Sequence, residues 1–198
     1  MQKCIRKMFV GAALVAFCAA PALAADEADE LMAGKLVIVK TGTLAKFIAK
    51  GTFDLPNVPA NDPTVEGATL LLKDLGPPVQ SNTYTLGSGN WTALGNPAGS
   101  KGFKYKGAGT PTDPCKVVLV KGKIVKAVCK GSGVTVTTPF TGQAAINLKV
   151  GTDSKHYCAR FGGTEIKNNA TLMKRMDAPV PGTCSSPSGA FLAAASLF

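Results

Sequence analysis

The sequence predicts an all-β fold, an antiparallel β-sandwich or an open barrel, over residues 35–184. Three observations predict it. Short runs rich in Val, Ile, Leu and Thr are separated by Gly and Pro residues, and several runs alternate apolar and polar side chains. No segment beyond the N-terminal leader keeps a helical period. Four cysteines in this region indicate two disulfides, which small exported domains commonly use.

The expected strands follow one another along the chain, and each has the length of a typical strand. They cover residues 36–40, 44–50, 68–75, 83–86, 116–121, 124–130, 134–138, 144–150 and 155–161. One short helical turn is expected at 90–94, because Asn90 can cap a turn that carries Trp91. The strand spacing and the turn residues between runs favour antiparallel neighbours.

The sequence also indicates an internal duplication. Lys35-Leu-Val-Ile-Val-Lys40 matches Lys116-Val-Val-Leu-Val-Lys121. After a one-residue deletion, Lys46-Phe-Ile-Ala-Lys-Gly-Thr52 matches Lys126-Ala-Val-Cys-Lys-Gly-Ser132. Each copy is expected to be a hairpin that turns at Gly42 or Gly122, so the domain is interpreted as two related β units. Chance similarity between strands of narrow composition is the alternative.

The duplication predicts the disulfide pairing. Gly34 aligns with Cys115 and Ala49 aligns with Cys129, so one copy has both cysteines and the other has neither. A hairpin that turns at Gly122 places Cys115 and Cys129 opposite each other, within reach of a disulfide. Cys158 then pairs with Cys184. The spacing of the four cysteines does not fit a zinc site, which uses close pairs.

The first residues have the three regions of a secretory signal peptide. A basic stretch is followed by an apolar run that is too short to span a membrane, and Ala22-Leu-Ala24 forms a cleavage site. We therefore expect a signal peptide at 1–24, an acidic mobile segment at 25–34, one β domain at 35–184 and a flexible apolar tail at 185–198. The mature chain is expected to be secreted or periplasmic, with no transmembrane segment.

Several motifs resemble those of an uncharacterised family of exported bacterial β domains. The resemblance covers most of residues 35–184, and it implies export and the domain limits but no activity, ligand or functional residue. It rests on Asp62-Pro-Thr-Val-Glu-Gly-Ala-Thr-Leu70, Asn90-Trp-Thr-Ala-Leu-Gly-Asn-Pro-Ala-Gly-Ser-Lys-Gly-Phe-Lys-Tyr-Lys106, Pro114-Cys-Lys-Val-Val-Leu-Val-Lys121, Lys126-Ala-Val-Cys-Lys-Gly131, Tyr157-Cys-Ala-Arg-Phe-Gly-Gly-Thr164 and Ala178-Pro-Val-Pro-Gly-Thr-Cys184.

The basic residues indicate the class of partner. Loss of Lys3, Arg6 and Lys7 with the leader lowers the formal net charge from +10 to +7, and the remaining basic residues are almost all lysines. Lysine is a solvated point charge, whereas arginine is the usual residue of base and phosphate recognition. We interpret the lysines first as solubilising residues and protection of strand edges, and second as a surface for an anionic envelope or extracellular polymer. No signature of sequence-specific nucleic-acid binding is present.

No catalytic or metal-binding cluster is visible in the sequence, and we expect no cofactor and no enzyme activity. The only histidine, His156, lacks a second histidine for a usual metal site. Trp91, Phe103 and Tyr105 could form a sugar-binding platform, but packing in the core is the preferred interpretation. The neighbouring Lys101, Lys104 and Lys106 could add attraction for an acidic polymer. In the second hairpin Lys123 and Lys126 are candidates for binding a polyanion, within the set Lys116, Lys121, Lys123, Lys126 and Lys130.

The function expected from the sequence is therefore a non-catalytic exported β domain with a structural or binding role at the cell envelope or outside the cell. The alternatives are a glycan-active hydrolase that uses scattered carboxylates and a module that binds acidic polysaccharides.

Overall fold

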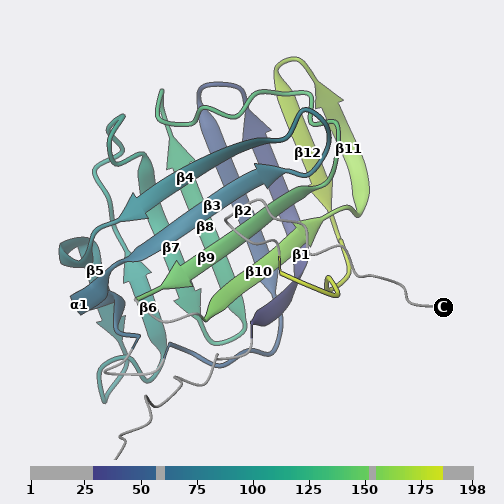
Figure 1. Ribbon diagram of the computed structural model, residues 1–198. Coiled ribbons are helices and arrows are strands. Elements are labelled where there is room, and N and C mark those ends of the chain that lie inside the picture. Colours follow the sequence, from purple (N-terminus) through teal and green to yellow (C-terminus); the bar gives the residue numbers. More distant parts are fainter. Residues whose placement is uncertain (1–28, 57–60, 152–154, 185–198) are drawn as a thin grey trace, which may run out of the picture.

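The computed structural model describes residues 29–56, 61–151 and 155–184. Most of these residues lie in the strands of one curled sheet (Figure 1). The elements are β1 (Glu30–Lys40), β2 (Leu44–Lys50), α1 (Pro63–Glu66), β3 (Ala68–Asp74), β4 (Gln80–Leu86), the 3₁₀ turn η1 (Ser88–Asn90), β5 (Trp91–Leu94), β6 (Gly102–Tyr105), β7 (Cys115–Lys121), β8 (Ile124–Lys130), β9 (Ala144–Val150), β10 (His156–Phe161), β11 (Thr164–Asn169) and β12 (Leu172–Met176). The expected signal peptide and C-terminal tail lie outside the described residues.

The sheet forms an open barrel, which confirms the fold class predicted from the sequence. The strand order is β4-β3-β9-β10-β1-β2-β8-β7-β6-β5, and β12 pairs with both β1 and β11. Figure 1 shows β4, β3, β9 and β10 crossing in front of β1, β2, β8 and β7. The sheet thus folds over itself, and its concave side encloses the hydrophobic core.

The core consists of the inward side chains of both halves. In β2 and β8 every second residue is buried, and the two strands share the same burial pattern. The largest fully buried side chains are Tyr105, Tyr157, Phe47, Phe103, Phe161, Met32, Leu70, Leu72, Leu86, Ile146, Leu148 and Met173. Burial of apolar area at about 25 cal/mol per Å² makes this filling the main stabilising contribution to the fold.

β1 joins the two halves of the sheet. Its first residues pair with β10 in parallel, from Glu30 with Tyr157 to Ala33 with Arg160. Its later residues pair with β12 in antiparallel register, and β2 follows the other edge of β1. The β1–β10 ladder is the one departure from antiparallel pairing among the described strands, and the sequence did not predict it.

Gly34 lies where β1 changes partner from β10 to β12. A Cβ atom at this position would lie 2.4 Å from the Arg160 carbonyl oxygen and 2.6 Å from the Phe161 ring. The Gly34 carbonyl in turn accepts a hydrogen bond of 2.8 Å from the Ala178 amide. Glycine is therefore required here by the close approach of the strands.

The first and second hairpins lie side by side in the sheet. β2 pairs with β8 in antiparallel register, with Leu44 opposite Lys130 and Lys50 opposite Ile124. In the alignment that predicts the duplication, Leu44 corresponds to Ile124 and Lys50 to Lys130. Exchanging the two hairpins therefore turns the pair Leu44–Lys130 into the pair Ile124–Lys50. The register is therefore the one that a local two-fold axis between the hairpins requires.

The irregularities of the two hairpins also correspond. β1 has a register shift between Gly34 and Leu36, and β7 has one between Cys115 and Val117. Gly34 and Cys115 occupy equivalent positions in the two hairpins. The turn glycines Gly42 and Gly122 have positive φ values of 65° and 55°. Both hairpins thus share their turn geometry and the position of their β-bulge.

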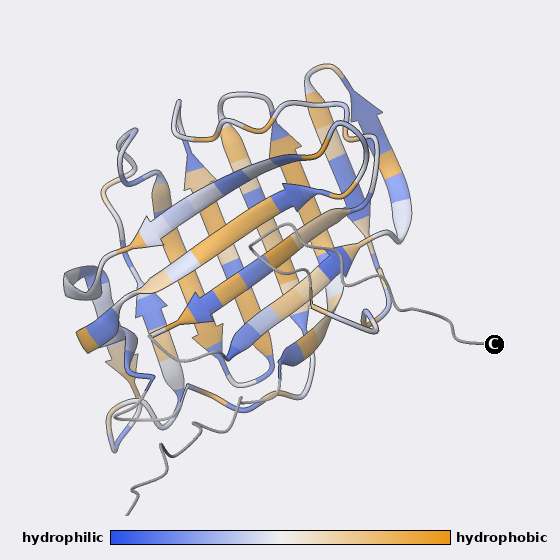
Figure 2. Ribbon diagram, in the orientation of Figure 1, coloured by the Kyte–Doolittle hydropathy of each residue, from blue (hydrophilic) through white to orange (hydrophobic). Residues whose placement is uncertain are grey.

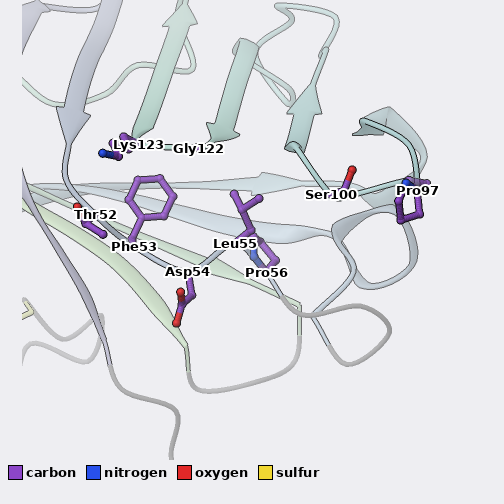
Figure 3. Close-up of a pocket in the computed structure, with 11 residues that line it drawn as sticks. Thr52, Phe53, Asp54, Leu55, Pro56, Pro97, Ser100, Gly122 and Lys123 are labelled. Carbon is purple, nitrogen blue, oxygen red and sulfur yellow. The ribbon is translucent and has the colours of Figure 1, made fainter.

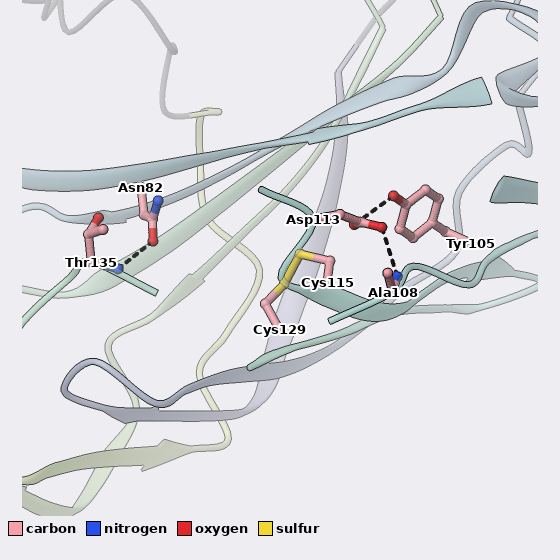
Figure 4. Close-up of a disulfide and its surroundings, with 7 residues drawn as sticks. All are labelled: Asn82, Tyr105, Ala108, Asp113, Cys115, Cys129 and Thr135. Atoms are coloured by element: carbon pink, nitrogen blue, oxygen red, sulfur yellow. Dashed lines mark hydrogen bonds between the residues drawn. A yellow bond between two sulfur atoms is a disulfide. The ribbon is translucent and has the colours of Figure 1, made fainter. Parts of the chain in front are cut away.

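Both predicted disulfides are confirmed, Cys115–Cys129 and Cys158–Cys184. Cys115 and Cys129 are directly opposite each other on β7 and β8, as the hairpin register predicted (Figure 4). Cys158 lies on β10, and Cys184 follows the last strand. The second disulfide therefore holds the segment after β12 against β10.

The expected strand at 134–138 is wrong, because this segment forms no backbone ladder. Its amides are instead bound by side chains of the edge strand β4: Asn82 Oδ1 accepts from the Thr135 amide and Gln80 Oε1 accepts from the Thr137 amide, both at 2.8 Å. Val134 and Val136 are still buried, as their alternation predicted. The side chains of Asn82 and Gln80 lie between the two backbones and take the place of a ladder.

Other boundaries also differ from the sequence predictions. Residues 91–94 form strand β5 rather than a helical turn, because Trp91 to Leu94 pair with β6. β1 begins at Glu30, inside the range 25–34 that was expected to be mobile. The Glu30 carboxylate lies 3.0 Å from the Lys155 ammonium and accepts from the Asp54 amide, which holds this end of β1. β6, β11 and β12 were not predicted, and β11 is almost wholly exposed.

Gly34 provides a test of the β1 junction. Replacement by alanine should lower the free energy of unfolding by about 1–3 kcal/mol, because the added methyl group overlaps the β10 backbone and the Phe161 ring. Gly87→Ala is the matched control, since a Cβ there meets nothing within 4 Å. Urea unfolding of the two variants measures the difference. Equal stability of the two variants would contradict the close approach of β1 and β10.

Candidate functional site

The outer face of the hairpin pair carries a regular set of lysines. Because side chains alternate along a strand, the buried Phe47, Ala127 and Val118 place their neighbours on the opposite, outward face. In Figure 2, hydrophilic and hydrophobic bands alternate along these strands. The lysine face is defined here by eight lysines on six adjacent strands: Lys174, Lys40, Lys46, Lys50, Lys126, Lys130, Lys121 and Lys104.

Aliphatic residues separate the lysines on this face. Lys46 lies opposite Ile38 on one side and Val128 on the other. Lys126 lies opposite Ile48 and Leu119 in the same way.

The pattern extends to the remaining lysines of the face. Lys104 faces Leu119 and Lys174 faces Ile38. None of the eight lysines is directly opposite another of the eight, a placement that would bring like charges closest together, although Lys174 is opposite Lys167 of β11. The half-buried aliphatic residues support the methylene stems of the lysines, whose ammonium groups extend to water.

The lysine face contains no acidic side chain. β2, β6, β7, β8 and β12 have no Asp or Glu, and the one acid of β1, Glu30, lies at its far end. The ion pairs found within the described ranges are Lys35–Asp177, Lys155–Glu30 and Arg175–Glu165. None of them includes one of the eight lysines, although Lys35, in the bulge of β1, is paired with Asp177 directly after β12. The face therefore presents positive charge without a neighbouring carboxylate on the same strands.

The position of these lysines argues against edge protection. β4 and β5 are the two ends of the strand order, and neither contains a lysine. The lysines are instead concentrated on β2 and β8, in the middle of the sheet. A central strand has no free backbone edge to protect. The further edge strand β11, which pairs only with β12, does carry Lys167, so edge protection fits that lysine better than the eight lysines of the face.

Trp91, Phe103 and Tyr105 lie in the core and do not form an accessible sugar platform. Their exposed fractions are 6 %, 0 % and 1 %. The Trp91 indole donates to the Leu86 carbonyl, and its ring lies 5.3 Å from the Tyr105 ring. The Tyr105 hydroxyl donates to Asp113 Oδ1 at 2.8 Å, and Asp113 Oδ2 accepts from the Ala108 amide (Figure 4). The preferred interpretation of these aromatics as core residues is confirmed.

The two candidate lysines lie in different surroundings. Lys126 is part of the lysine face, whereas Lys123 lies in the β7–β8 turn beside an open groove of about 650 Å³ (Figure 3). The groove is bounded by the segment after β2 and by the loop after β5. Asp54 is the one acid among its described lining residues. A glycosidase pair needs two carboxyl groups across a cleft, so this groove does not provide one.

His156 belongs to a structural contact. Its Nδ1 atom lies 2.6 Å from Asn147 Oδ1, and Asn147 Nδ2 donates to Cys184 Sγ at 3.3 Å. Asn147 is buried and lies opposite Cys158 on the neighbouring strand. These residues surround the Cys158–Cys184 disulfide. Within the described ranges no group of three or more His, Cys, Asp or Glu side chains is arranged to hold a metal ion.

Comparison with known proteins provides no family assignment. No family model, no curated protein and no solved structure matches the chain. The resemblance to exported β domains therefore stays a prediction. None of the helices in the described part of the chain has the length and apolar character that a membrane crossing needs.

Four of the eight face lysines, Lys40, Lys46, Lys50 and Lys174, were not considered as candidates from the sequence. Alternation within each strand shows which residues share a face of that strand, but the order β12-β1-β2-β8-β7-β6 is set by contacts between distant segments. The equal spacing of lysines in the two hairpin copies was the available signal, since it places Lys46 and Lys126 at equivalent positions.

Two buried tyrosines provide a test of the core by pH. Burial raises the pKa of Tyr84 and of Tyr105 above the ordinary value of about 10. The unfolded chain loses these protons first as the pH rises, so the free energy of unfolding should fall above about pH 10. The Tyr84 hydroxyl has no hydrogen-bond partner in the described part of the chain. Tyr84→Phe should therefore keep its stability at neutral pH and lose less of it at about pH 11 than the wild type.

Tyr105→Phe is the matched comparison. It also removes a titrating hydroxyl, but it breaks the hydrogen bond to Asp113 and should lower stability by about 1 kcal/mol at neutral pH. Urea unfolding at both pH values measures these effects. A neutral-pH loss for Tyr84→Phe as large as that for Tyr105→Phe would contradict this assignment.

Proposed function

We propose that the chain is a non-catalytic extracytoplasmic binding domain that attaches to an anionic partner through the lysine face. The observation that carries the proposal is the concentration of eight lysines, with no acid, on one face of six adjacent strands. Such a face produces a positive field that attracts and orients polyanions. The core position of the aromatics and the single acid of the groove favour binding over hydrolysis.

Solubility alone is a weaker explanation of this face. Diagonal neighbours on adjacent strands are about 7–8 Å apart. Two unit charges at that distance repel by about 0.5 kcal/mol in water. A surface with both signs interspersed keeps a protein soluble without this repulsion. The absence of compensating acids on these strands is therefore better explained by an anionic partner that supplies the negative charge.

The proposed location is outside the cytoplasm. Two disulfides are present, and disulfides persist in non-reducing compartments. The leader at 1–24 and the resemblance to exported bacterial β domains support export to the periplasm or the exterior. The two related hairpins support an origin of the face by duplication, since their register and bulges correspond.

Export predicts a defined N-terminus. Protein isolated from the periplasm or the culture medium should begin at Ala25, because the leader is removed after Ala24. Intact-mass measurement under non-reducing conditions gives the first residue and the loss of four protons for the two disulfides. Recovery of the extracytoplasmic protein with Met1 would contradict the leader assignment.

The lysine face predicts salt-dependent binding to polyanions. We expect micromolar binding of heparin, used as a probe, at physiological ionic strength, and a decline of more than tenfold at about 0.5 M salt. Lys46→Glu with Lys126→Glu should weaken binding at least tenfold, or about 1.4 kcal/mol. Isothermal titration calorimetry measures both effects.

A charge-matched control separates the face from net charge. Lys101 is exposed in the loop before β6, and Lys149 lies on β9 in the front half of the sheet, so both are outside the face. Lys101→Glu with Lys149→Glu changes the net charge by the same amount and should weaken binding less than threefold. Equal losses in the two variants, or no binding by the wild type, would count against the proposed function.

A further inference from the structure

Four lysines of the face form one diagonal line across four strands. Lys46 is opposite Ile38, so Lys40 is its diagonal neighbour on β1. Lys46 is also opposite Val128, so Lys126 is its diagonal neighbour on β8. Lys126 is opposite Leu119, which makes Lys121 the next lysine on β7. With diagonal steps of about 7–8 Å, the line Lys40–Lys46–Lys126–Lys121 extends roughly 20–25 Å.

The opposite diagonal direction contains no comparable line. Lys50 and Lys126 are diagonal neighbours in that direction, and the next position on β7 is Val117. Lys130 and Lys46 are related in the same way, and the next position on β1 is Leu36. Each run then reaches an aliphatic residue of a β-bulge, whose extra residue is Lys116 on β7 or Lys35 on β1, and Lys35 is paired with Asp177. The regular ladder therefore contains one unbroken diagonal of four lysines, which favours that direction for a row of anionic groups.

The diagonal line has the two-fold relation of the hairpins. Lys40 corresponds to Lys121 and Lys46 to Lys126, so the axis passes between Lys46 and Lys126.

The other four lysines of the face obey the same relation. Lys50 corresponds to Lys130, and Lys104 corresponds to Lys174, since they face the equivalent residues Leu119 and Ile38. A chain that lies along the line meets the same sequence of charges from either end.

From this arrangement we infer that the partner is a linear acidic polysaccharide whose chain lies along the line Lys40–Lys46–Lys126–Lys121. The inference rests on the proposed function and adds the chemical class and the direction of the ligand. A row of evenly spaced ammonium groups matches a flexible polymer with carboxylate or sulfate groups at regular intervals. The aliphatic residues between the lysines provide apolar contact for the sugar rings.

A membrane surface and a nucleic acid fit the face less well. Surfaces that bind lipid headgroups usually insert exposed Trp, Phe or Leu beside the basic residues. Here Trp91 and Phe103 are buried in the core, and leucines of the face such as Leu119 are half-buried between the lysines. Single-stranded nucleic acids are bound by basic grooves with aromatic platforms, and recognition of phosphate favours arginine. The eight basic residues of the face are all lysines, and no aromatic residue lies among them.

The test compares two sets of four lysines on the same face. Lys40, Lys46, Lys121 and Lys126 are changed to Gln in one variant, and the off-line lysines Lys50, Lys104, Lys130 and Lys174 are changed to Gln in the other. Both variants lose four charges, and both sets are two-fold symmetric. We expect the first variant to bind heparin and polygalacturonate at least thirtyfold more weakly than the wild type, and the second less than fivefold more weakly.

Half-line variants test the two-fold relation. Lys40→Gln with Lys46→Gln and Lys121→Gln with Lys126→Gln should weaken binding equally, within about twofold. Circular dichroism and thermal melting establish that each variant is folded, and a size series of heparin fragments gives the length at which affinity levels off. The two polymers distinguish sulfate from carboxylate as the bound group.

The outcomes separate this inference from the proposed function. Equal losses for the on-line and off-line variants would overturn the line and leave an anion-binding face. Tighter binding to anionic phospholipid vesicles or to single-stranded DNA than to both polymers would overturn the polysaccharide. Failure of the wild type to bind any polyanion would overturn the proposed function itself.

Discussion

The shared strand β1 is the element on which the rest of the fold depends. Its backbone forms hydrogen bonds with β2 along one edge, and with β10 and then β12 along the other. This change of partner is possible only because Gly34 has no side chain where β10 turns away. The front half of the sheet, with β3, β4, β9 and β10, is therefore attached through β1 to the half that contains both hairpins. A side chain at Gly34 would push against the β10 backbone and so weaken the junction between two layers whose inward faces form one core.

The lysine face follows from the same arrangement. The front half covers the inner face of the hairpin pair, so every second residue of β2 and β8 is buried against it. Their other face is left to solvent, and there lysines and aliphatic residues alternate both along and across the strands. Lysine suits these central positions because its stem covers the neighbouring aliphatic residue while its charge remains hydrated. The same positions bring the charges into a line when the two hairpins pair.

The local sequence pattern was sufficient to predict the two hairpins and the pairing of the cysteines. Alternating runs predicted the bounds of β2 and β8, and the position of Gly122 predicted Cys115 opposite Cys129. The parallel β1–β10 ladder was missed because the pairing of two distant strands has no local signal, and β11 was missed because it is exposed and lacks apolar alternation.

Two further features depended on contacts between distant segments. Residues 134–138 have the alternation of a strand, but Asn82 and Gln80 occupy the space in which a ladder would form. Lys40 and Lys46 of the lysine line were not considered as candidates, because the line exists only after distant strands are in register.

The two hairpins differ most at the bulged ends, where they contact different neighbouring segments. Gly34 and Ala49 of the first hairpin are opposite each other, as are Cys115 and Cys129 of the second. A cysteine at position 34 would place its Cβ against the Arg160 carbonyl oxygen, so the first hairpin cannot carry the equivalent disulfide while it pairs with β10. The second hairpin has no such neighbour at Cys115, and there a covalent bond fixes the ends of β7 and β8. The disulfide and the glycine are thus alternative ways of fixing the same bulged end of a hairpin, and both leave the outward lysines of the two copies in equivalent places.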